Sequence, residues 1–501
     1  MTQPDFQTFE QNYNAGKTQL VWEWVPSDLE TPVSAYLKLC KHDPNCFLLE
    51  SVEGGETLGR YSVLGYAPDL IWTCKNGKVS ITINGEEQNQ EQTNPIESLR
   101  HQLACAKIDE VPESLPPMAV SGLFGYMGYD MVRLVEKLPD TNPDDLAIPD
   151  SILLRPEILV IFDSVKKMAC LSAPVYQHAQ NSELTAAQAY EQACKIIQAA
   201  KEKLNSPKEL SLLDETSKLS TPLDIRSNMS PDEFKSAVQK MIDYTYEGDI
   251  FQGVPSQRFN VDFDLSSFAF YRTLRRVNPS PFMFHLTFNG FQIVGASPEI
   301  LVRVRDDNVT IRALAGTRKR GANKAEDEAL KADLLADEKE CAEHLMLVDL
   351  GRNDVGRVSE FGTVKVTEKF VVEFYSHVMH IVSNITGKLK SSLDIVDALF
   401  AGFPAGTLSG APKIRAMEII DEVEVSRRSY YAGAVGYLSG NGTLDTCIAI
   451  RTALIKDGKL YIQSGAGVVA DSIPESEHQE TINKAKGVIH AAELTIEESK
   501  K

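Results

Sequence analysis

The chain has 501 residues, of which 43% are hydrophobic and 24% are charged, a composition typical of a globular protein. This length is enough for two ordinary domains or one large layered assembly. Its 51 basic and 70 acidic residues give a formal net charge of −19, and no block of Lys and Arg is present, which excludes nonspecific nucleic-acid binding. The charge does not exclude an anionic ligand, because exposed charges are screened over roughly 8–10 Å at physiological salt.

The cysteines and the apolar segments indicate where the protein works. The eight cysteines are scattered and include no CxxC pair, as expected in a reducing compartment. The N-terminal residues show no basic segment followed by an apolar core, so we expect no signal peptide. The nearest candidate for a membrane helix, residues 152–162, is interrupted by Arg155, Pro156 and Glu157 and falls short of the roughly 20 residues required. We therefore expect a cytoplasmic protein that does not enter a membrane.

The N-terminal part, to about Ser172, alternates short apolar runs with turn residues. Residues 79–83 alternate with period two and end at Asn84-Gly85, which predicts a β-hairpin. Residues 159–162 predict a buried strand, and residues 186–204, rich in Ala, Gln, Glu and Lys, predict a helix.

A polar stretch over residues 205–228 predicts a linker. Directly after it, Ser230-Pro231-Asp232-Glu233 has the pattern of a capped helix start. Strands are predicted at 292–294, 309–312 and 461–463, and no internal repeat is present. Because strands are not regularly followed by helices, we expect an α+β fold in which large antiparallel or mixed sheets are layered with helices. The predicted division is an N-terminal domain over 1–204, a linker over 205–228 and a second domain over 229–501.

Two predicted helices carry acidic faces. In the helix beginning near Asp337, Glu340 and Glu343 lie on one face, ahead of an apolar run that indicates burial. In the helix that follows Ser472, Glu477 and Glu480 share a face. These carboxylates are either a solvated acidic turn, which favours a helix N-terminus, or oxygen ligands of a hard cation such as Mg²⁺.

Two glycine-rich segments could approach an anion. Residues 403–413 lack the GxxxxGK[ST] spacing of a phosphate loop, so nucleotide binding is not expected. Residues 464–469 follow a predicted strand and are either a tight turn or a place where backbone N–H groups meet an anion. The chain has no GxSxG motif and no cysteine in a glutaminase-like setting.

Read in order, these segments resemble the chorismate-utilising enzymes, and most closely the large subunit of anthranilate synthase, from about Val33 to Gly487. The resemblance lies in many motifs that occur in the same order. These are residues 248–252 (GDIFQ), 295–299 (GASPE), 315–318 (AGTR), 343–350 (EHLMLVDL), 352–354 (RND), 444–448 (LDTCI) and 465–467 (GAG).

The resemblance implies a site for each part of the substrate. It places Mg²⁺ between Glu343 and Glu480, with Glu340 and Glu477 in the outer shell. The ring carboxylate of chorismate would be bound by Gly465, Ala466, Gly467 and Lys484. Its enolpyruvyl carboxylate would be bound by Tyr431 and Arg451. The pocket around it would be lined by Gly316, Thr317 and Thr407.

The resemblance also implies the chemistry. Glu299 matches the proposed general acid for the departing ring hydroxyl, His380 matches the histidine of the later aromatising elimination, and Thr407 belongs to the catalytic positions. From the residues alone, Glu299 could equally be a surface carboxylate and His380 a strand histidine without a catalytic role.

Two positions distinguish members of the family. Enzymes that add water to chorismate have lysine where this chain has Gln252, and aminodeoxychorismate synthases commonly have lysine where it has Ala315. The resemblance therefore implies conversion of chorismate and ammonia to anthranilate and pyruvate, the first committed step of tryptophan biosynthesis. The alternatives are an aminodeoxychorismate synthase component I and a non-catalytic regulator that binds chorismate or tryptophan. Gly253 departs from the family, which usually has a branched apolar residue there.

Partners and regulation follow from the same resemblance. Because the chain contains no glutaminase motif, a separate glutamine amidotransferase subunit would supply ammonia, in a heterotetramer of two large and two small subunits. Leu48-Leu49-Glu50-Ser51 matches the feedback site for L-tryptophan in the N-terminal domain, and Pro281-Phe282-Met283 forms its second wall. The alternative for Leu48 and Leu49 is ordinary core packing.

Overall fold

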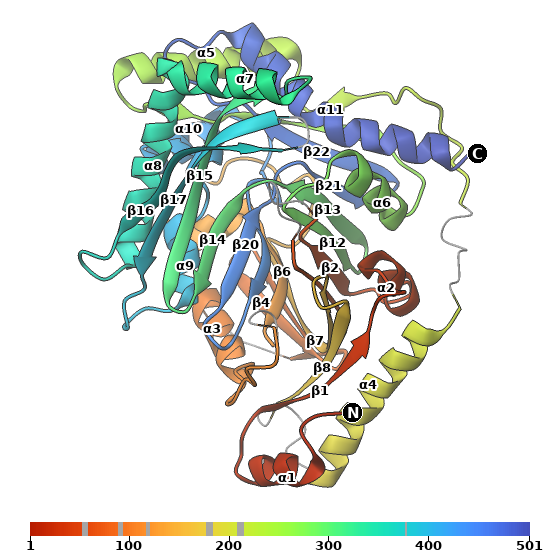
Figure 1. The fold of residues 1–501 in the computed structure, drawn as a ribbon. Coiled ribbons are helices and arrows are strands. Elements are labelled where there is room, and N and C mark those ends of the chain that lie inside the picture. The colour runs from red at the N-terminus through yellow and green to blue at the C-terminus, as the bar shows by residue number, and fades with distance from the viewer. Residues whose placement is uncertain (53–58, 89–93, 117–120, 177–183, 208–214, 376–377) are drawn as a thin grey trace.

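The computed structural model describes all residues except 53–58, 89–93, 117–120, 177–183, 208–214 and 376–377. Within the described residues, 20 strands are connected into one hydrogen-bonded network, all of whose strand pairs are antiparallel, and two further strands form a small separate pair. Helices lie against the outer faces of this network (Figure 1). The expected α+β fold of large sheets layered with helices is confirmed.

The network consists of two long arms that face each other. The first arm runs in the order β9 (Arg226–Ser227), β11 (Ser256–Asp262), β22 (Lys459–Gly465), β21 (Thr452–Lys456), β13 (Phe291–Ser297), β12 (Phe282–Phe288) and β2 (Cys46–Glu50). The second arm runs in the order β16 (Lys365–Phe374), β17 (Val378–Lys388), β15 (Asn308–Lys319), β14 (Ile300–Arg305), β20 (Leu444–Ile448), β19 (Ala434–Leu438) and β6 (Leu123–Met127).

Two long strands join the arms. β3 (Tyr61–Lys75) pairs with β2 of the first arm, and β7 (Ser151–Asp163) pairs with β6 of the second arm and with β3. The remaining strands extend this junction: β8 (Met168–Val175), β1 (Gln19–Pro26), β4 (Lys78–Ile83) and β5 (Glu86–Gln88). The separate pair consists of β10 (Gln252–Gly253) and β18 (Gly410–Ala411).

Three apolar layers hold the arms and helices together. Between the arms, the ring of Phe47 on β2 stacks on that of Phe124 on β6, with centroids 4.6 Å apart. One outer layer covers the first arm and the neighbouring strands β1, β3 and β8, and its helices are α2 (Pro32–Leu39), α4 (Ala186–Asn205), α6 (Ser267–Val277) and α11 (Pro474–Glu498). The other outer layer covers the second arm and the neighbouring strands β3 and β4, and its helices are α3 (Pro95–Cys105), α8 (Glu338–Val358) and α9 (Ile395–Gly402). Burial of these layers provides the main driving force for the fold.

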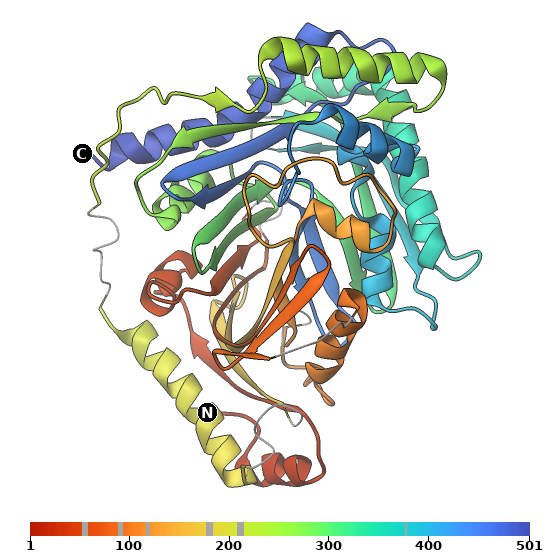
Figure 2. The same cartoon turned by 180° about the vertical axis from the view of Figure 1, so that it is seen from behind.

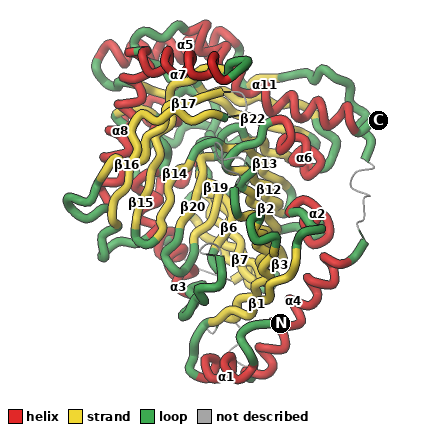
Figure 3. The backbone as a smooth tube through the Cα atoms, viewed as in Figure 1, coloured by secondary structure: helices red, strands yellow, loops and turns green. Residues whose placement is uncertain are grey.

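The other helices are peripheral. They are α1 (Phe6–Asn14), which packs on α4, α5 (Pro231–Glu247) and α10 (Lys413–Val423), which share a small apolar cluster, and α7 (Lys324–Ala336), which packs beside β15 and β17. Figure 2 shows the same arrangement from behind, and Figure 3 shows α11 running alongside β22. The short 3₁₀ helices Tyr129–Leu134 and Gly406–Leu408 complete the described elements.

Several local predictions are confirmed. Asn84-Gly85 joins β4 and β5 with both residues at positive φ, 49° and 84°. The residues predicted as a helix at 186–204 form α4. At the start of α5, Ser230 and Glu233 form a reciprocal capping box. Among the described residues, no helix is long and apolar enough to cross a membrane.

The two predicted domains contribute strands to the same network. β2 pairs with β12, and β6 pairs with β19, so residues before and after the predicted linker lie next to each other. Part of that linker, 208–214, lies outside the described residues. The division into 1–204, 205–228 and 229–501 stays a prediction.

Candidate active site

The chain passes between the two arms at two neighbouring places, and each carries a predicted site residue. Glu299 lies where the chain leaves β13 for β14, and Arg451 lies where it returns from β20 to β21. The crossings are linked by backbone bonds, since the Ile448 N–H donates to the Glu299 carbonyl (3.1 Å) and the Ala296 N–H donates to the Arg451 carbonyl (3.2 Å). The ends of both arms therefore position these two side chains.

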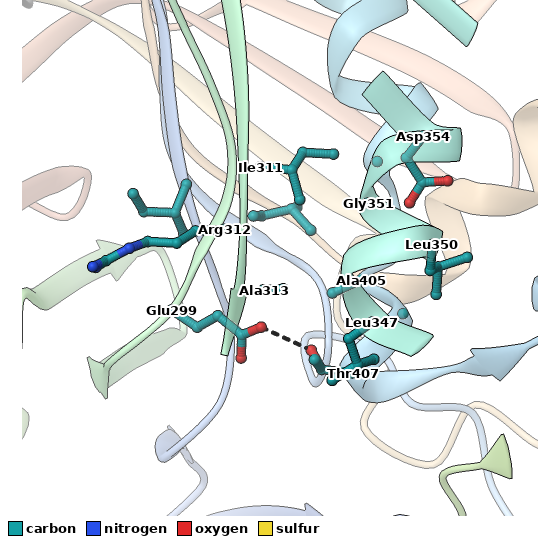
Figure 4. A pocket seen from close by; sticks show the side chains of 14 residues that line it. Glu299, Ile311, Arg312, Ala313, Leu347, Leu350, Gly351, Asp354, Ala405 and Thr407 are labelled. Carbon is teal, nitrogen blue, oxygen red and sulfur yellow. Dashed lines mark hydrogen bonds between the residues drawn. The ribbon is translucent and has the colours of Figure 1, made fainter. Parts of the chain in front are cut away.

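Glu299 is in a strongly desolvated environment. Its side chain is buried, and the Thr407 hydroxyl donates a hydrogen bond of 3.0 Å to its Oε1 (Figure 4). Burial raises the pKa of Glu299 to about 8, although Thr407 and the cations Arg451, Lys484 and Arg312 oppose the shift. The carboxyl group therefore holds its proton at neutral pH, as a general acid requires.

A small cavity of about 30 Å³ lies beside this pair, with room for one water molecule. Glu299, Arg312 and Thr407 line it together with Leu347 and Asp354 of α8 (Figure 4). Glu299 is only 6% exposed, so it lies between the second arm and α8 and is not a surface carboxylate.

His380 lies on β17 between Thr317 of β15 and Glu373 of β16, its cross-strand neighbours. Its Nδ1 is 3.1 Å from the Gly316 carbonyl oxygen, which can only accept, so Nδ1 carries the proton and also approaches the Thr317 hydroxyl at 3.0 Å. Burial lowers the pKa of His380 to about 4, with Arg451 contributing in the same direction. Nε2 is buried and has no hydrogen-bond partner among the described residues. His380 is thus neutral, with an unoccupied basic nitrogen.

Arg451 provides a cation next to these two groups. It has a left-handed backbone (φ 50°), and burial lowers the pKa of its guanidinium while Glu299 opposes that shift. No hydrogen bond to this guanidinium comes from the part of the chain that the structure describes. A desolvated guanidinium with free donors is suited to a carboxylate.

The turn after β22 brings together another group of predicted residues. The Lys484 ammonium donates to the Gly465 carbonyl oxygen (2.9 Å) and pairs with Glu480 (2.7 Å). A Cβ atom at Gly465 would lie 3.1 Å from the Tyr431 hydroxyl, and one at Gly467 would lie 2.7 Å from Gln252 Nε2. A side chain at either glycine would collide with these neighbours, so the close packing of the turn requires glycine at both positions.

Four carboxylates face one another from α8 and α11. Burial raises the pKa of Glu343, and the charges of Glu340, Glu477 and Glu480 add to the shift. Burial also raises the pKa of Glu477, with a contribution from Glu480. Within the described residues, no three His, Cys, Asp or Glu side chains are placed to hold a metal ion by themselves. Mg²⁺ needs only one or two carboxylates when waters and ligand oxygens complete its shell, so this donor set fits that ion.

Arg428 is a structural residue of the site that the sequence analysis did not identify. Its side chain is 1% exposed, pairs with Glu424 and donates to the carbonyl oxygens of Leu408 and Val254, each at 2.6 Å. Its guanidinium also lies 4.8–5.5 Å from two tyrosine rings, one of them that of Tyr431. Its only sequence signal was a glutamate four residues earlier, which is common at surfaces.

The residues predicted for tryptophan come together at a separate place. Glu50 of β2 and Met283 of β12 are cross-strand partners, with Ser51 after β2 and Phe282 beginning β12 after Pro281. The Glu50 carboxylate is buried and accepts hydrogen bonds from Arg275 (2.8 and 3.2 Å) and from the Tyr271 hydroxyl.

Comparison with known proteins identifies the class to which this fold and site belong. A sequence profile described as chorismate binding enzyme matches residues 44–490. The chain therefore belongs to the chorismate-binding enzyme family.

Similar proteins of known name show which part of this family the chain resembles. Anthranilate synthase component 1 of Cereibacter sphaeroides is 53% identical over an alignment of 495 residues that covers 97% of each chain. The protein of that name from Pseudomonas putida is 46% identical over 480 residues, 95% of each chain. The resemblance that the motifs indicated is confirmed.

Solved structures agree. Anthranilate synthase component I from Streptococcus pneumoniae superposes with a TM-score of 0.75 at 38% identity, covering 93% of this chain and 99% of that one. MenF, the menaquinone-specific isochorismate synthase from Escherichia coli, gives a TM-score of 0.70 at 20% identity over 97% and 99% of the two chains, a similarity of fold alone.

Proposed function

We propose that this protein converts chorismate and ammonia to anthranilate and pyruvate. The observation that carries the proposal is the pair of oppositely shifted groups in one desolvated site: a protonated carboxyl at Glu299 and a neutral imidazole at His380. A reaction that first gives a proton to a leaving group and later removes one from a ring carbon needs both at the same pH. Homologues named anthranilate synthase component 1 support the product.

The reaction would proceed in two stages. In amination, Glu299 protonates the ring hydroxyl, which leaves as water while ammonia bonds to the opposite end of the diene and the two ring double bonds shift. The nitrogen bonded to the ring then loses a proton to solvent. In elimination, His380 Nε2 takes the proton from the aminated ring carbon, whose C–H electrons form the ring double bond. The C–O bond to the enolpyruvyl group breaks, and the released enolpyruvate takes up a proton to become pyruvate.

The two carboxylates of chorismate would be held at opposite sides of the site. Arg451 and Tyr431 suit the enolpyruvyl carboxylate, and Lys484 with the Gly465–Gly467 turn suits the ring carboxylate. One close charge pair is worth about 4 kcal/mol at an effective dielectric near 20, so these local cations outweigh the diffuse net charge.

Glu343 and Glu480 would hold Mg²⁺, with Glu340 and Glu477 around them. When bound, the ion would neutralise the ring carboxylate and let it approach these acidic side chains. The raised pKa values of Glu343 and Glu477 support this assignment, because clustered carboxylates need either protons or a cation.

Ammonia and feedback control complete the proposal. A glutamine amidotransferase subunit would deliver ammonia, since most free ammonia is ammonium at neutral pH.

L-Tryptophan would bind near Glu50, Ser51 and Met283 and stabilise a less active arrangement of the protein. Replacing Ser51 by Phe should remove tryptophan inhibition and leave turnover without tryptophan within about twofold; unchanged inhibition contradicts this assignment.

A single assay tests the main proposal. Purified protein with chorismate, MgCl₂ and an ammonium salt should produce fluorescent anthranilate, and chelation of the metal should stop it. An aminodeoxychorismate synthase would consume chorismate without this fluorescence or pyruvate. A non-catalytic binding protein would leave chorismate unchanged, and its chorismate affinity would survive Glu480→Gln, which should abolish turnover in the enzyme.

A further inference from the structure

Glu373 and Tyr375, which have no role so far, link Arg312 beside Glu299 to His380. Glu373 of β16 forms an ion pair with Arg312 of β15, and the Tyr375 hydroxyl donates a 2.9 Å hydrogen bond to the other oxygen of Glu373. Tyr375 is buried, and Arg320 donates a 2.6 Å hydrogen bond to its carbonyl oxygen. Both oxygens of Glu373 are thus used within the protein.

Each end of this chain of contacts reaches a catalytic group. Arg312 lines the same small cavity as Glu299 (Figure 4). At the other end, the Tyr375 ring meets the His380 imidazole in a T-shaped contact, with centroids 5.6 Å apart. Glu373 is also the cross-strand partner of His380, so their side chains share one face of the sheet.

The His380 ring needs such support. Its Nδ1 is bonded to the Gly316 carbonyl oxygen, but Nε2 has no partner among the described residues. A single bonded nitrogen leaves the imidazole free to tilt about that bond. The edge contact with Tyr375 restricts this tilt, and the hydroxyl bond to Glu373 fixes the tyrosine in turn.

We propose that Tyr375, held by the Glu373–Arg312 ion pair, is a positioning residue that keeps His380 aimed at the substrate for the elimination stage. This inference rests on the proposed function, because it assigns Tyr375 to the second of its two stages. A misaligned His380 leaves amination intact and slows only the loss of pyruvate. The aminated ring intermediate, which contains chorismate plus ammonia less water, then leaves the enzyme.

The ratio of chorismate consumed to anthranilate formed measures this directly. A structural role alone lowers the amount of active enzyme and leaves the ratio at one. In the full-length protein with MgCl₂ and ammonium, wild type should give a ratio of one. Tyr375→Leu, which removes the ring, should raise it at least threefold and release a compound with the mass of the aminated intermediate.

Conservative variants make the test specific. Tyr375→Phe keeps the ring edge but loses the hydroxyl bond to Glu373, so its ratio should lie between that of wild type and that of Tyr375→Leu. Glu373→Gln weakens the ion pair that holds Tyr375 without changing the shape of the side chain, and it should give a ratio above one. This variant provides the test if Tyr375→Leu does not fold. Tyr437→Leu removes an equally buried ring from the layer between the arms and should keep a ratio of one.

The outcomes separate this inference from the function on which it rests. If wild type forms no anthranilate, the proposed function fails. If wild type forms it at a ratio of one, and folded Tyr375→Leu and Glu373→Gln do the same, the positioning role of Tyr375 is overturned and the function stands.

Discussion

Replacing Glu299 by Gln should abolish turnover and, at the same time, stabilise the protein. Glutamine keeps the oxygen that accepts the Thr407 hydrogen bond but cannot ionise or donate a proton to the leaving group. Loss of general acid catalysis should lower anthranilate formation by about 10²-fold or more.

The stability gain depends on pH in a defined direction. The pKa of Glu299 is raised from 4.5 to about 8 in the folded state, so between these values the folded protein binds more protons than the unfolded chain. The free energy of unfolding of the wild type therefore falls as pH rises through this range, whereas that of the glutamine variant does not. At about 1.4 kcal/mol per unit of pKa, the variant's advantage should grow from roughly 1 kcal/mol at pH 5 to roughly 4 kcal/mol at pH 8.

Urea denaturation of both proteins at pH 5, 6, 7 and 8 measures this difference. Glu113→Gln, which changes an exposed loop carboxylate in the same way, is the matched control. A Glu299→Gln difference that stays flat within about 1 kcal/mol over this range would refute the argument that burial keeps the carboxyl protonated.

Three further predictions concern other parts of the site. In an NMR titration, His380 should remain neutral, with its proton on Nδ1, from pH 8 down to about 4; protonation near 6.5 would contradict its desolvation. Glu343→Gln should raise the melting temperature without Mg²⁺ and remove any stabilisation by added MgCl₂, whereas an undiminished response to the metal would place the ion elsewhere. Arg428→Met leaves Glu424 buried and unpaired and should cost about 3–5 kcal/mol in urea denaturation, and a cost below 1 kcal/mol would show that the pair is not structural.

Local patterns in the sequence were sufficient to predict many secondary-structure elements. The Ser230–Glu233 capping box and the Asn84-Gly85 turn depend on neighbouring residues only, so their patterns identify them directly. The motifs also pointed to Glu299 and His380, which the fold brings to one site. Their protonation states could not be predicted, because burial by distant strands and helices determines them.

The supporting residues depend on strand register and were not predicted. Glu373 lies opposite His380 only because β16 and β17 pair with register shifts, and Phe370, at one of these irregularities, has a positive φ of 56°. Tyr375 then follows at the end of β16. A shift of one residue would move each of these side chains to the other face of the sheet, and no local pattern fixes such a shift.

The pairing of early strands with late ones has a consequence for synthesis of the protein. β2 (Cys46–Glu50) can pair with β12 (Phe282–Phe288), and β6 (Leu123–Met127) with β19 (Ala434–Leu438), only after the later strand has been synthesised. The partner lies more than 200 residues further along the chain in each case. A nascent chain still attached to the ribosome therefore carries two strands with unpaired edges, which attract other chains. Folding is completed only near the end of translation, when β19 closes the second arm and Arg451, the Gly465–Gly467 turn and Lys484 follow it.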